Sequence, residues 1–255
     1  MRLLVLASGS SGNSALIESG GRAVLLDAGI SARETLRRVA LAGAADAHIE
    51  AILLTHEHSD HVRGVRVLAR RLGIPVMATP GTLRAAGAHL ADVPRQTPID
   101  RRESFTVAGI RVTAFATEHD ATEPVGYAFE SRRGHRVVVA TDTGIVTDEV
   151  AAALAGAHVI GLEANHDALM LDMGPYPPFL KRRIASDRGH LSNEAAASAL
   201  ASASWSGLAH VFALHISEQN NTPDAAVRAL SRSLHYQGGP DLAAVVRNEI
   251  AGCTV

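Results

Sequence analysis

Short apolar runs recur along the whole chain and are separated by Gly, Ser and charged residues. Runs of this length, bounded by turn residues, are typical of β-strands. The first three lie close together with only Ser- and Gly-rich turns between them, which predicts consecutive strands of a meander. The predicted strands lie at residues 3–6, 15–17, 23–26, 51–54, 74–78, 104–107, 110–115, 125–130, 136–140, 158–162, 210–214 and 242–246.

Other segments place apolar residues at helical spacing. The first of them has Ser31 as its predicted N-cap, Glu34 at the capping-box position and Gly43 as its end. Strand-rich and helix-bearing halves of similar size predict two sheets packed face to face with helices outside, an α/β (α+β) fold. We expect residues 1–255 to form a single domain. The predicted helices lie at residues 30–43, 62–72, 147–154, 178–185, 192–203 and 223–235.

The composition narrows the choice of partners and cofactors. A formal charge of −2 gives no overall attraction to nucleic acid, so a polyanionic substrate must be held by a local patch or by bound metal. Cys253 is the single cysteine, which excludes an intrachain disulfide and a cysteine-based zinc site. No apolar stretch reaches the ~18 residues that span a bilayer, so we expect a cytoplasmic protein without a membrane partner.

The segment THEHSDH directly follows the strand predicted at 51–54 and contains His56, His58, Asp60 and His61. Neutral imidazole and carboxylate are ligands preferred by zinc, manganese and iron, and open catalytic sites use about three protein ligands plus water. If the strand continues extended, positions 56 and 58 share one side, whereas 60 and 61 follow a turn. One loop is therefore expected to serve two metals.

Three later apolar strands also end in potential ligands. His119 follows AFATE, Asp142 follows VVVAT, and His215 follows VFAL. Each has the form of several apolar residues, one or two others, and then the ligand. A lone residue of this kind is commonly a strand cap, but the recurrence favours a shared metal site.

Together these motifs resemble those of the metallo-β-lactamase superfamily, whose four-layer αββα sandwich holds one or two metals between the ends of its sheets. The resemblance implies that a bridging carboxylate offsets the repulsion between two cations roughly 3.5–4 Å apart. It also implies that Asp27, which closes the strand at 23–26, supports the metal-binding loop. The implied ligands are His56, His58 and His119 for the first metal, Asp60, His61 and His215 for the second, and Asp142 as the bridge.

Further motifs resemble the phosphodiesterase branch of this superfamily, which includes ribonuclease Z. There, the histidine that matches His190 contacts the scissile phosphate or the leaving oxygen, and an acidic residue, here Glu163, orients it. Seven blocks in order resemble the YycJ/WalJ-type hydrolases and imply a DNA exonuclease acting from the 5′ end. These blocks are SGSSGNS, THEHSDH, EHDATEPVGY, EANHD, PYPPFLKRRI, GHLSN and HISEQNNTP.

Four further residues are predicted to contact the substrate. Ser10 and Asn13 lie in the Gly/Ser-rich segment 8–14, whose backbone amides suit a phosphate and equally suit a tight turn. His166 is a candidate for a phosphate or a terminal group, with a structural role as the alternative. Ser192 fits a phosphate ligand as well as it fits the N-cap of the following helix.

These observations lead to a hypothesis of phosphodiester hydrolysis by hydroxide that two divalent ions, zinc, manganese or iron, activate. Asp60 would help to orient the water, and His190 would stabilise the developing charge or protonate the leaving oxygen. Nucleic acid, DNA in preference, is the expected partner. Because the interval from Asp142 to His190 is short and no basic arm is visible, a small phosphodiesterase for cyclic nucleotides is the enzymatic alternative. A non-catalytic metal-binding scaffold is the third, which the intact ligand set and His190 disfavour.

Overall fold

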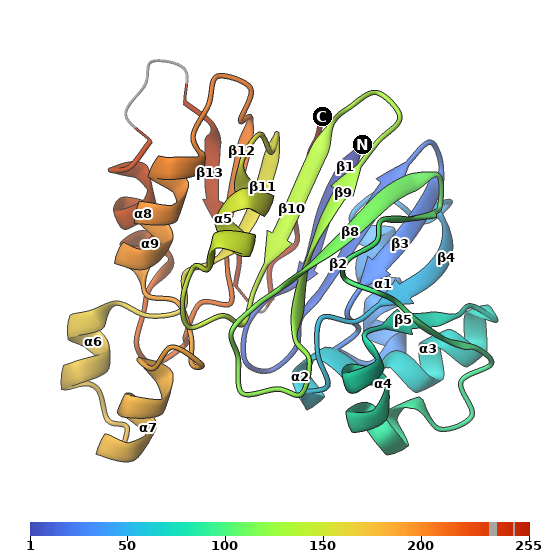
Figure 1. Ribbon diagram of the computed structural model, residues 1–255, viewed down its shortest axis with the longest axis horizontal. Helices are drawn as coiled ribbons and strands as arrows, with labels where there is room; N and C mark the ends of the chain where they lie inside the picture. Colours follow the sequence, from blue (N-terminus) through green and yellow to red (C-terminus); the bar gives the residue numbers. More distant parts are fainter. Residues whose placement is uncertain (235–238, 247) are drawn as a thin grey trace.

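The computed structural model describes residues 1–234, 239–246 and 248–255, and within them two mixed sheets face each other (Figure 1). In pairing order, the first sheet contains β14 (Ala251–Thr254), β1 (Arg2–Ala7), β2 (Ser14–Ser19), β3 (Arg22–Leu26), β4 (His48–Leu53), β5 (Val76–Ala78) and β6 (Gln96–Pro98). The second contains β13 (Asp241–Ala244), β12 (His210–Leu214), β11 (Val159–Glu163), β10 (Arg136–Ala140), β9 (Val125–Glu130), β8 (Ile110–Ala116) and β7 (Phe105–Val107).

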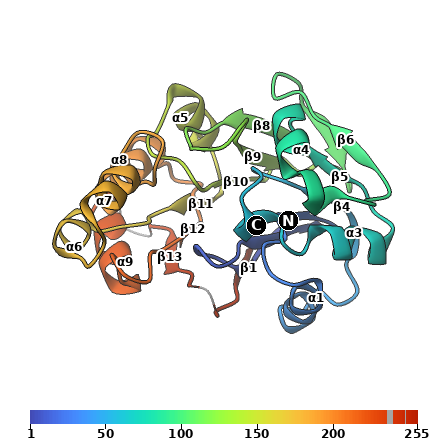
Figure 2. The same cartoon turned by 90° about the horizontal axis from the view of Figure 1, so that it is seen from below.

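Helices cover the outer face of each sheet, which gives the four-layer αββα sandwich that the sequence predicted (Figures 1 and 2). On the first sheet lie α1 (Ala32–Leu41), α3 (Val65–Leu72), α4 (Pro80–Ala86) and the 3-10 helix η1 (Gly87–Leu90). On the second lie α5 (Asp148–Leu154), α8 (Asn193–Ala203) and α9 (Pro223–Ser231). Beyond the sheet ends lie α2 (Ser59–Val62), α6 (Ala168–Met173) and α7 (Pro178–Ile184).

Three apolar clusters hold the layers together. The central one lies between the two sheets and includes Leu3, Tyr127, Phe129 and Phe212. The other two lie between each sheet and its helices. The central strands are covered on both faces, so their residues are apolar at nearly every position and form continuous apolar runs in the sequence. Each fully buried Leu or Phe side chain contributes about 1.5–3 kcal/mol to stability. Tyr127 also donates a hydrogen bond from its hydroxyl to the carbonyl of Leu54, which fixes the end of β4 from inside the sandwich.

The structure corrects several predicted boundaries. The helix predicted at 62–72 corresponds to α3 and begins at Val65, because residue 62 ends α2 and residues 63 and 64 form a turn. Gly64 in this turn lies so close to the neighbouring backbone that a Cβ would be 2.1 Å from the carbonyl oxygen of Ile30. The helix predicted at 223–235 ends at Ser231, and residue 235 lies outside the described part of the chain. The strand predicted at 242–246 spans Asp241–Ala244.

The predicted cap of α1 is confirmed in part. The Ser31 side chain accepts a hydrogen bond from the backbone N–H of Glu34, as expected of an N-cap. The Glu34 carboxylate, expected to complete a capping box, instead accepts hydrogen bonds from Arg37 and Arg38. These ion pairs hold the pKa of Glu34 at about 2.

Several short elements were not predicted, namely β6, β14, α2, α4, α6 and η1. Each is too short to show a clear period, and β14 is defined by its antiparallel pairing with β1 at the other end of the chain. In the part of the chain that the structure describes, no helix has the length and apolar character needed to cross a bilayer.

Candidate active site

The candidate site residues converge because several strands end at the same edge of the sandwich. Strands β10, β11 and β12 are mutually parallel, and β8 runs in the same direction because β9 is antiparallel to both β8 and β10. In the facing sheet, β3 and β4 are parallel as well. The side chains that follow these strands therefore meet at one edge, the lower one in Figure 1, beside α2.

The first cluster contains His56, His58 and His119, whose potential ligand atoms lie within 4.8 Å of one another. His56 and His119 are buried, whereas the side chain of His58 is 34% exposed. The Nδ1 atom of His119 lies 3.0 Å from the carbonyl oxygen of Gly189 and donates to it, which leaves Nε2 to face the cluster. Nε2 of His56 is buried and has no hydrogen-bond partner among the described residues. An imidazole anchored through one nitrogen and unpartnered at the other has the arrangement of a metal ligand.

The second cluster lies next to the first and is centred on His61 and Asp142. Nε2 of His61 lies 3.3 Å from Oδ2 of Asp142 and 3.5 Å from Oδ2 of Asp60. Nε2 of His215 lies 4.0 Å from the same oxygen of Asp60 and, within the described residues, has no hydrogen-bond partner. The loop 56–61 thus contributes residues to both clusters.

Asp27 fixes the orientation of His61. Its Oδ2 atom accepts a hydrogen bond from Nδ1 of His61 at 2.8 Å, so that Nε2 of the ring points toward Asp142. The same carboxylate accepts hydrogen bonds from the backbone N–H and the hydroxyl of Thr55. Asp27 therefore holds Thr55 and His61, at the two ends of the loop that carries the candidate ligands, in place.

The protonation states of His56 and Asp142 suit cation binding, whereas His61 would have to lose a proton first. Burial, followed by the neighbouring His61, lowers the pKa of His56 well below its usual value, so this imidazole is neutral. Burial raises the pKa of Asp142, but His215 and His61 outweigh it and hold the pKa well below the usual range. For His61, burial opposes charge, but Asp142 and Asp27 outweigh it and raise the pKa well above 6.5. An ionised carboxylate beside a neutral imidazole offers the oxygen and nitrogen donors that a divalent cation binds.

A buried acid–imidazole pair lies beside the two clusters. Oε1 of Glu163 accepts a hydrogen bond from Nδ1 of His190 at 2.7 Å and lies 3.0 Å from Nδ1 of His215. Burial disfavours charge on His190, but the charge and hydrogen bond of Glu163 outweigh it and raise the pKa of His190 to about 9. Conversely, His190 and His215 outweigh burial and lower the pKa of Glu163 to about 2. His190 is thus a proton-carrying group whose other nitrogen points away from Glu163.

The four predicted substrate contacts are placed differently from one another. Ser10 is exposed and lines a cavity with His190. Asn13 is buried, and its Nδ2 atom donates to Asp60 and lies 2.9 Å from Nε2 of His61, so it contacts the candidate ligands. His166 is buried, and its Nδ1 atom has no partner among the described residues. The hydroxyl of Ser192 accepts from the backbone N–H at residue 195, which is the capping alternative.

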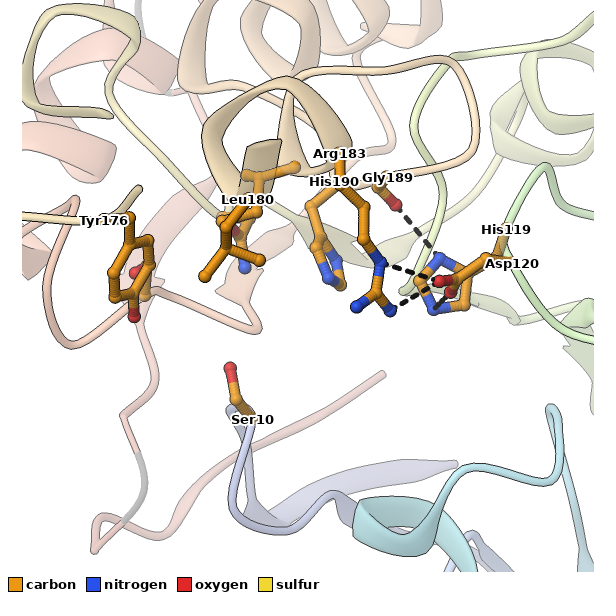
Figure 3. A pocket seen from close by; sticks show the side chains of 11 residues that line it. Ser10, His119, Asp120, Tyr176, Leu180, Arg183, Gly189 and His190 are labelled. Carbon is orange, nitrogen blue, oxygen red and sulfur yellow. Dashed lines mark hydrogen bonds and ion pairs between the residues drawn. The ribbon is translucent and has the colours of Figure 1, made fainter. Parts of the chain in front are cut away.

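Sequence reasoning missed a second ion pair at this edge. Arg183, on α7, donates from Nε to Oδ2 of Asp120 at 2.9 Å, and Oδ1 of Asp120 lies 3.2 Å from Nε2 of His119 (Figure 3). Burial of Asp120 is outweighed by His119 and Arg183, which lower its pKa. The adjacency of Asp120 to His119 was visible in the sequence, but its arginine partner is 63 residues away.

Comparisons with known proteins agree with this arrangement. The sequence profile described as a beta-lactamase superfamily domain matches residues 22–216. The chain is 37% identical to "Exodeoxyribonuclease YycJ" of Bacillus anthracis over 240 residues, 92% of this chain and 89% of that protein. It is 29% identical to "Ribonuclease Z" of Mycobacterium bovis over 218 residues, 74% of this chain and 75% of that protein. The crystal structure of the metallo-beta-lactamase fold protein YhfI from Bacillus subtilis has a TM-score of 0.74 at 15% identity, covering 99% of this chain and 100% of that one.

Proposed function

The chain belongs to the metallo-β-lactamase superfamily and is a metal-dependent hydrolase, and from this premise we propose that it cleaves phosphodiester bonds as a 5′-to-3′ exonuclease on DNA. The observation that carries the proposal is the position of the Glu163–His190 pair directly beside the two ligand clusters. A site that only holds a metal needs no protonated imidazole next to it, whereas cleavage of a phosphodiester requires a proton for the leaving oxygen.

Two divalent cations fit the donor set. Oδ1 of Asp142 lies 3.1 Å from Nδ1 of His215 and 3.9 Å from Nε2 of His119, and its Oδ2 lies 3.3 Å from Nε2 of His61, so the carboxylate lies between the two clusters. Asp142 is therefore the proposed bridge. The remaining proposed ligands are His56, His58 and His119 for one ion and Asp60, His61 and His215 for the other.

Buried donor atoms without partners support this fit. Among the described residues, Nε2 of His56, Nε2 of His215 and Oδ2 of Asp142 all lack hydrogen bonds. A buried polar atom left unpaired costs about 1–3 kcal/mol, so the grouping of three such atoms indicates a ligand that pairs with them. All-histidine and aspartate donors suit zinc, manganese and iron. When bound, such ions supply hydroxide at neutral pH and polarise a phosphoryl oxygen.

The chain's own residues supply the rest of the chemistry. Asp60 is half-buried and accepts a hydrogen bond from Asn13, which holds its carboxylate toward the centre of the site, where it orients the attacking water. His190 holds its proton because Glu163 binds Nδ1, and it offers Nε2–H to the leaving oxygen. Asn13 and Asp27 keep the rings and carboxylates of the loop 56–61 in place.

The DNA preference rests on the named activity of the Bacillus anthracis relative, which has higher identity and coverage than the matched ribonuclease Z. The net charge of −2 does not oppose it, because two divalent cations add a local charge of about +4 at the cleft. A 5′-phosphorylated DNA strand is therefore the proposed substrate.

The test compares end-labelled duplex DNA, single-stranded RNA and a 2′,3′-cyclic nucleotide as substrates of the zinc-, manganese- or iron-loaded protein. We expect stepwise shortening of DNA from its 5′ end. His215→Ala should abolish it, whereas His210→Ala, a histidine at the opposite end of β12, should not. Turnover of the cyclic nucleotide alone would replace the nuclease proposal with a small-molecule phosphodiesterase, and inertness toward all three would refute both.

A further inference from the structure

A small cavity opens directly beside the ligand clusters, between α7 and the loop that contains Ser10 (Figure 3). Its volume is about 170 Å³. Cavities that enclose a whole drug-sized molecule measure roughly 300–1,000 Å³, so this one accommodates a single ring system with a few substituents. Its lining residues are Ser10, His119, Asp120, Asn165, Tyr176, Leu180, Arg183, Ile184, Gly189, His190 and Ser217.

The two ends of the cavity differ in chemistry. His119, Asp120 and His190 lie at the end next to the candidate metal site, and Tyr176 and Leu180 lie at the other end (Figure 3). An aromatic ring beside an aliphatic side chain is a surface on which a nucleobase stacks irrespective of its identity. The cavity thus has one apolar end that suits a base and another end that lies beside the candidate metal site, where the phosphate would be cleaved.

The position of Tyr176 is fixed by the segment that carries it. Tyr176 lies in the turn between α6 and α7, and the ammonium group of Lys181 on α7 donates to the carbonyl of Asp172 on α6. The start of α6 is capped by Asp167, whose carboxylate accepts two backbone N–H groups. The two helices therefore hold the turn that carries Tyr176, and the Tyr176 side chain lines the cavity.

Arg183 lies at the junction of the two ends. Its Nε and Nη2 atoms both donate to Oδ2 of Asp120, so the guanidinium is held in one orientation, and its Nη1 takes no part in this pair. Asp120 in turn lies 3.2 Å from Nε2 of His119. A guanidinium fixed in this way beside the candidate metal site is suited to bind a phosphate oxygen.

We propose that this cavity binds the terminal nucleotide of the substrate strand, with the base on Tyr176 and Leu180 and the phosphate beside Arg183. The inference rests on the proposed function and adds to it the residues that recognise the strand end. Because the cavity has room for one base, it places the bond that follows the first nucleotide at the metal site. Mononucleotides are then the expected product.

The test measures the affinity of the metal-loaded protein for dAMP, dTMP and inorganic phosphate by isothermal titration calorimetry. Tyr176→Ala should weaken binding of both nucleotides roughly tenfold and leave phosphate affinity unchanged, because only the base contacts the ring. Tyr176→Phe should retain wild-type affinity. Arg183→Ala should weaken binding of all three ligands. Phe179→Ala and Arg182→Ala are the matched controls, since both residues lie on α7 outside the cavity lining and should have no effect.

The results that would contradict the inference about the cavity are as follows. Unchanged nucleotide affinity in Tyr176→Ala, or an equal loss in Phe179→Ala, would overturn the inference. A parallel loss of phosphate affinity in Tyr176→Ala would show that the site was damaged and that the ring does not bind the base. If the wild-type protein shortens DNA but the variants do not show the expected losses, only the inference about the cavity is refuted. If the wild-type protein cleaves no DNA, the proposed function is refuted.

Discussion

Replacing His190 by alanine tests the chemical role of the Glu163–His190 pair. The pKa of His190, about 9, lies roughly 2.5 units above the usual 6.5. At about 1.4 kcal/mol per unit, the site favours the protonated ring by on the order of 3 kcal/mol, and Glu163 is the main group that raises it. His190 is therefore built to carry a proton at neutral pH, and general acid catalysis typically contributes 10²–10⁴ in rate.

The effect of the His190→Ala change should depend on the leaving group. The leaving group of a thymidine dinucleotide is a nucleoside alkoxide, which needs a proton. The leaving group of the p-nitrophenyl ester of thymidine 5′-monophosphate is p-nitrophenolate, which is stable without one. We expect kcat to fall by about 10²–10⁴ on the dinucleotide and by less than about tenfold on the ester. Steady-state kinetics on both substrates at the same metal content provide the measurement.

The matched control is His210→Ala, which removes an imidazole from the start of β12, away from the site, and should leave both rates unchanged. Equal losses on the two substrates, with the metal content of the protein intact, would refute the role of His190 as an acid. That result would instead indicate that His190 binds the phosphate in both reactions.

Three further outcomes follow from the structure. Asp142→Ala removes the carboxylate that faces both clusters, so metal affinity measured by equilibrium dialysis should fall more than about 100-fold; undiminished binding would contradict the bridge. Gly29→Ala should lower the free energy of unfolding in urea by about 2 kcal/mol or more, since its Cβ would lie 1.5 Å from the carbonyl oxygen of Asp60; wild-type stability would contradict the packing. Burial raises the pKa of Cys253 to about 11, so at pH 8 iodoacetamide should alkylate it about 100-fold more slowly in the folded protein than in urea, and equal rates would count against this.

The sequence predicted the strand-end residues well because a simple pattern determines their position. Each follows a buried apolar run, and parallel strands bring their carboxyl ends to one edge of the sheet. His119, Asp142 and His215 belong to this class, and the structure brings all three together with the loop 56–61. The pattern of apolar runs predicts the strands, and the shared direction of these strands then brings the residues at their ends together.

The residues around this centre were predicted less well, because close approaches between loops determine their contacts. Asn13, predicted to contact substrate, is buried against Asp60 because the backbone of residue 13 bonds to both Asp60 and Gly29. The pair of Asp120 and Arg183 depends on how α7 packs against the end of β8. Such contacts join distant segments, and local sequence patterns do not reveal them.

Backbone conformation explains how the ligands are held in position. Asp27, Asp142 and His215 have φ values of 56°, 57° and 53°, in the left-handed region that costs a non-glycine residue about 1–2 kcal/mol. Asp27 and His215 directly follow the last residues of β3 and β12, whereas Thr141 lies between the end of β10 and Asp142. Thr55 donates to the Asp27 carboxylate, and the Ser8 hydroxyl accepts from the backbone N–H of His215.

Strained residues at the ends of three strands persist only where the surrounding structure determines them. The left-handed turn redirects the chain at the moment it leaves the sheet, and it lets the side chain of that same residue face the centre of the site. Because β3, β10 and β12 are each buried in the sandwich, the cost of these turns is offset by packing elsewhere in the molecule. The donor atoms of Asp142 and His215 are therefore positioned by the fold itself, and a cation that binds there meets ligands that need little further ordering.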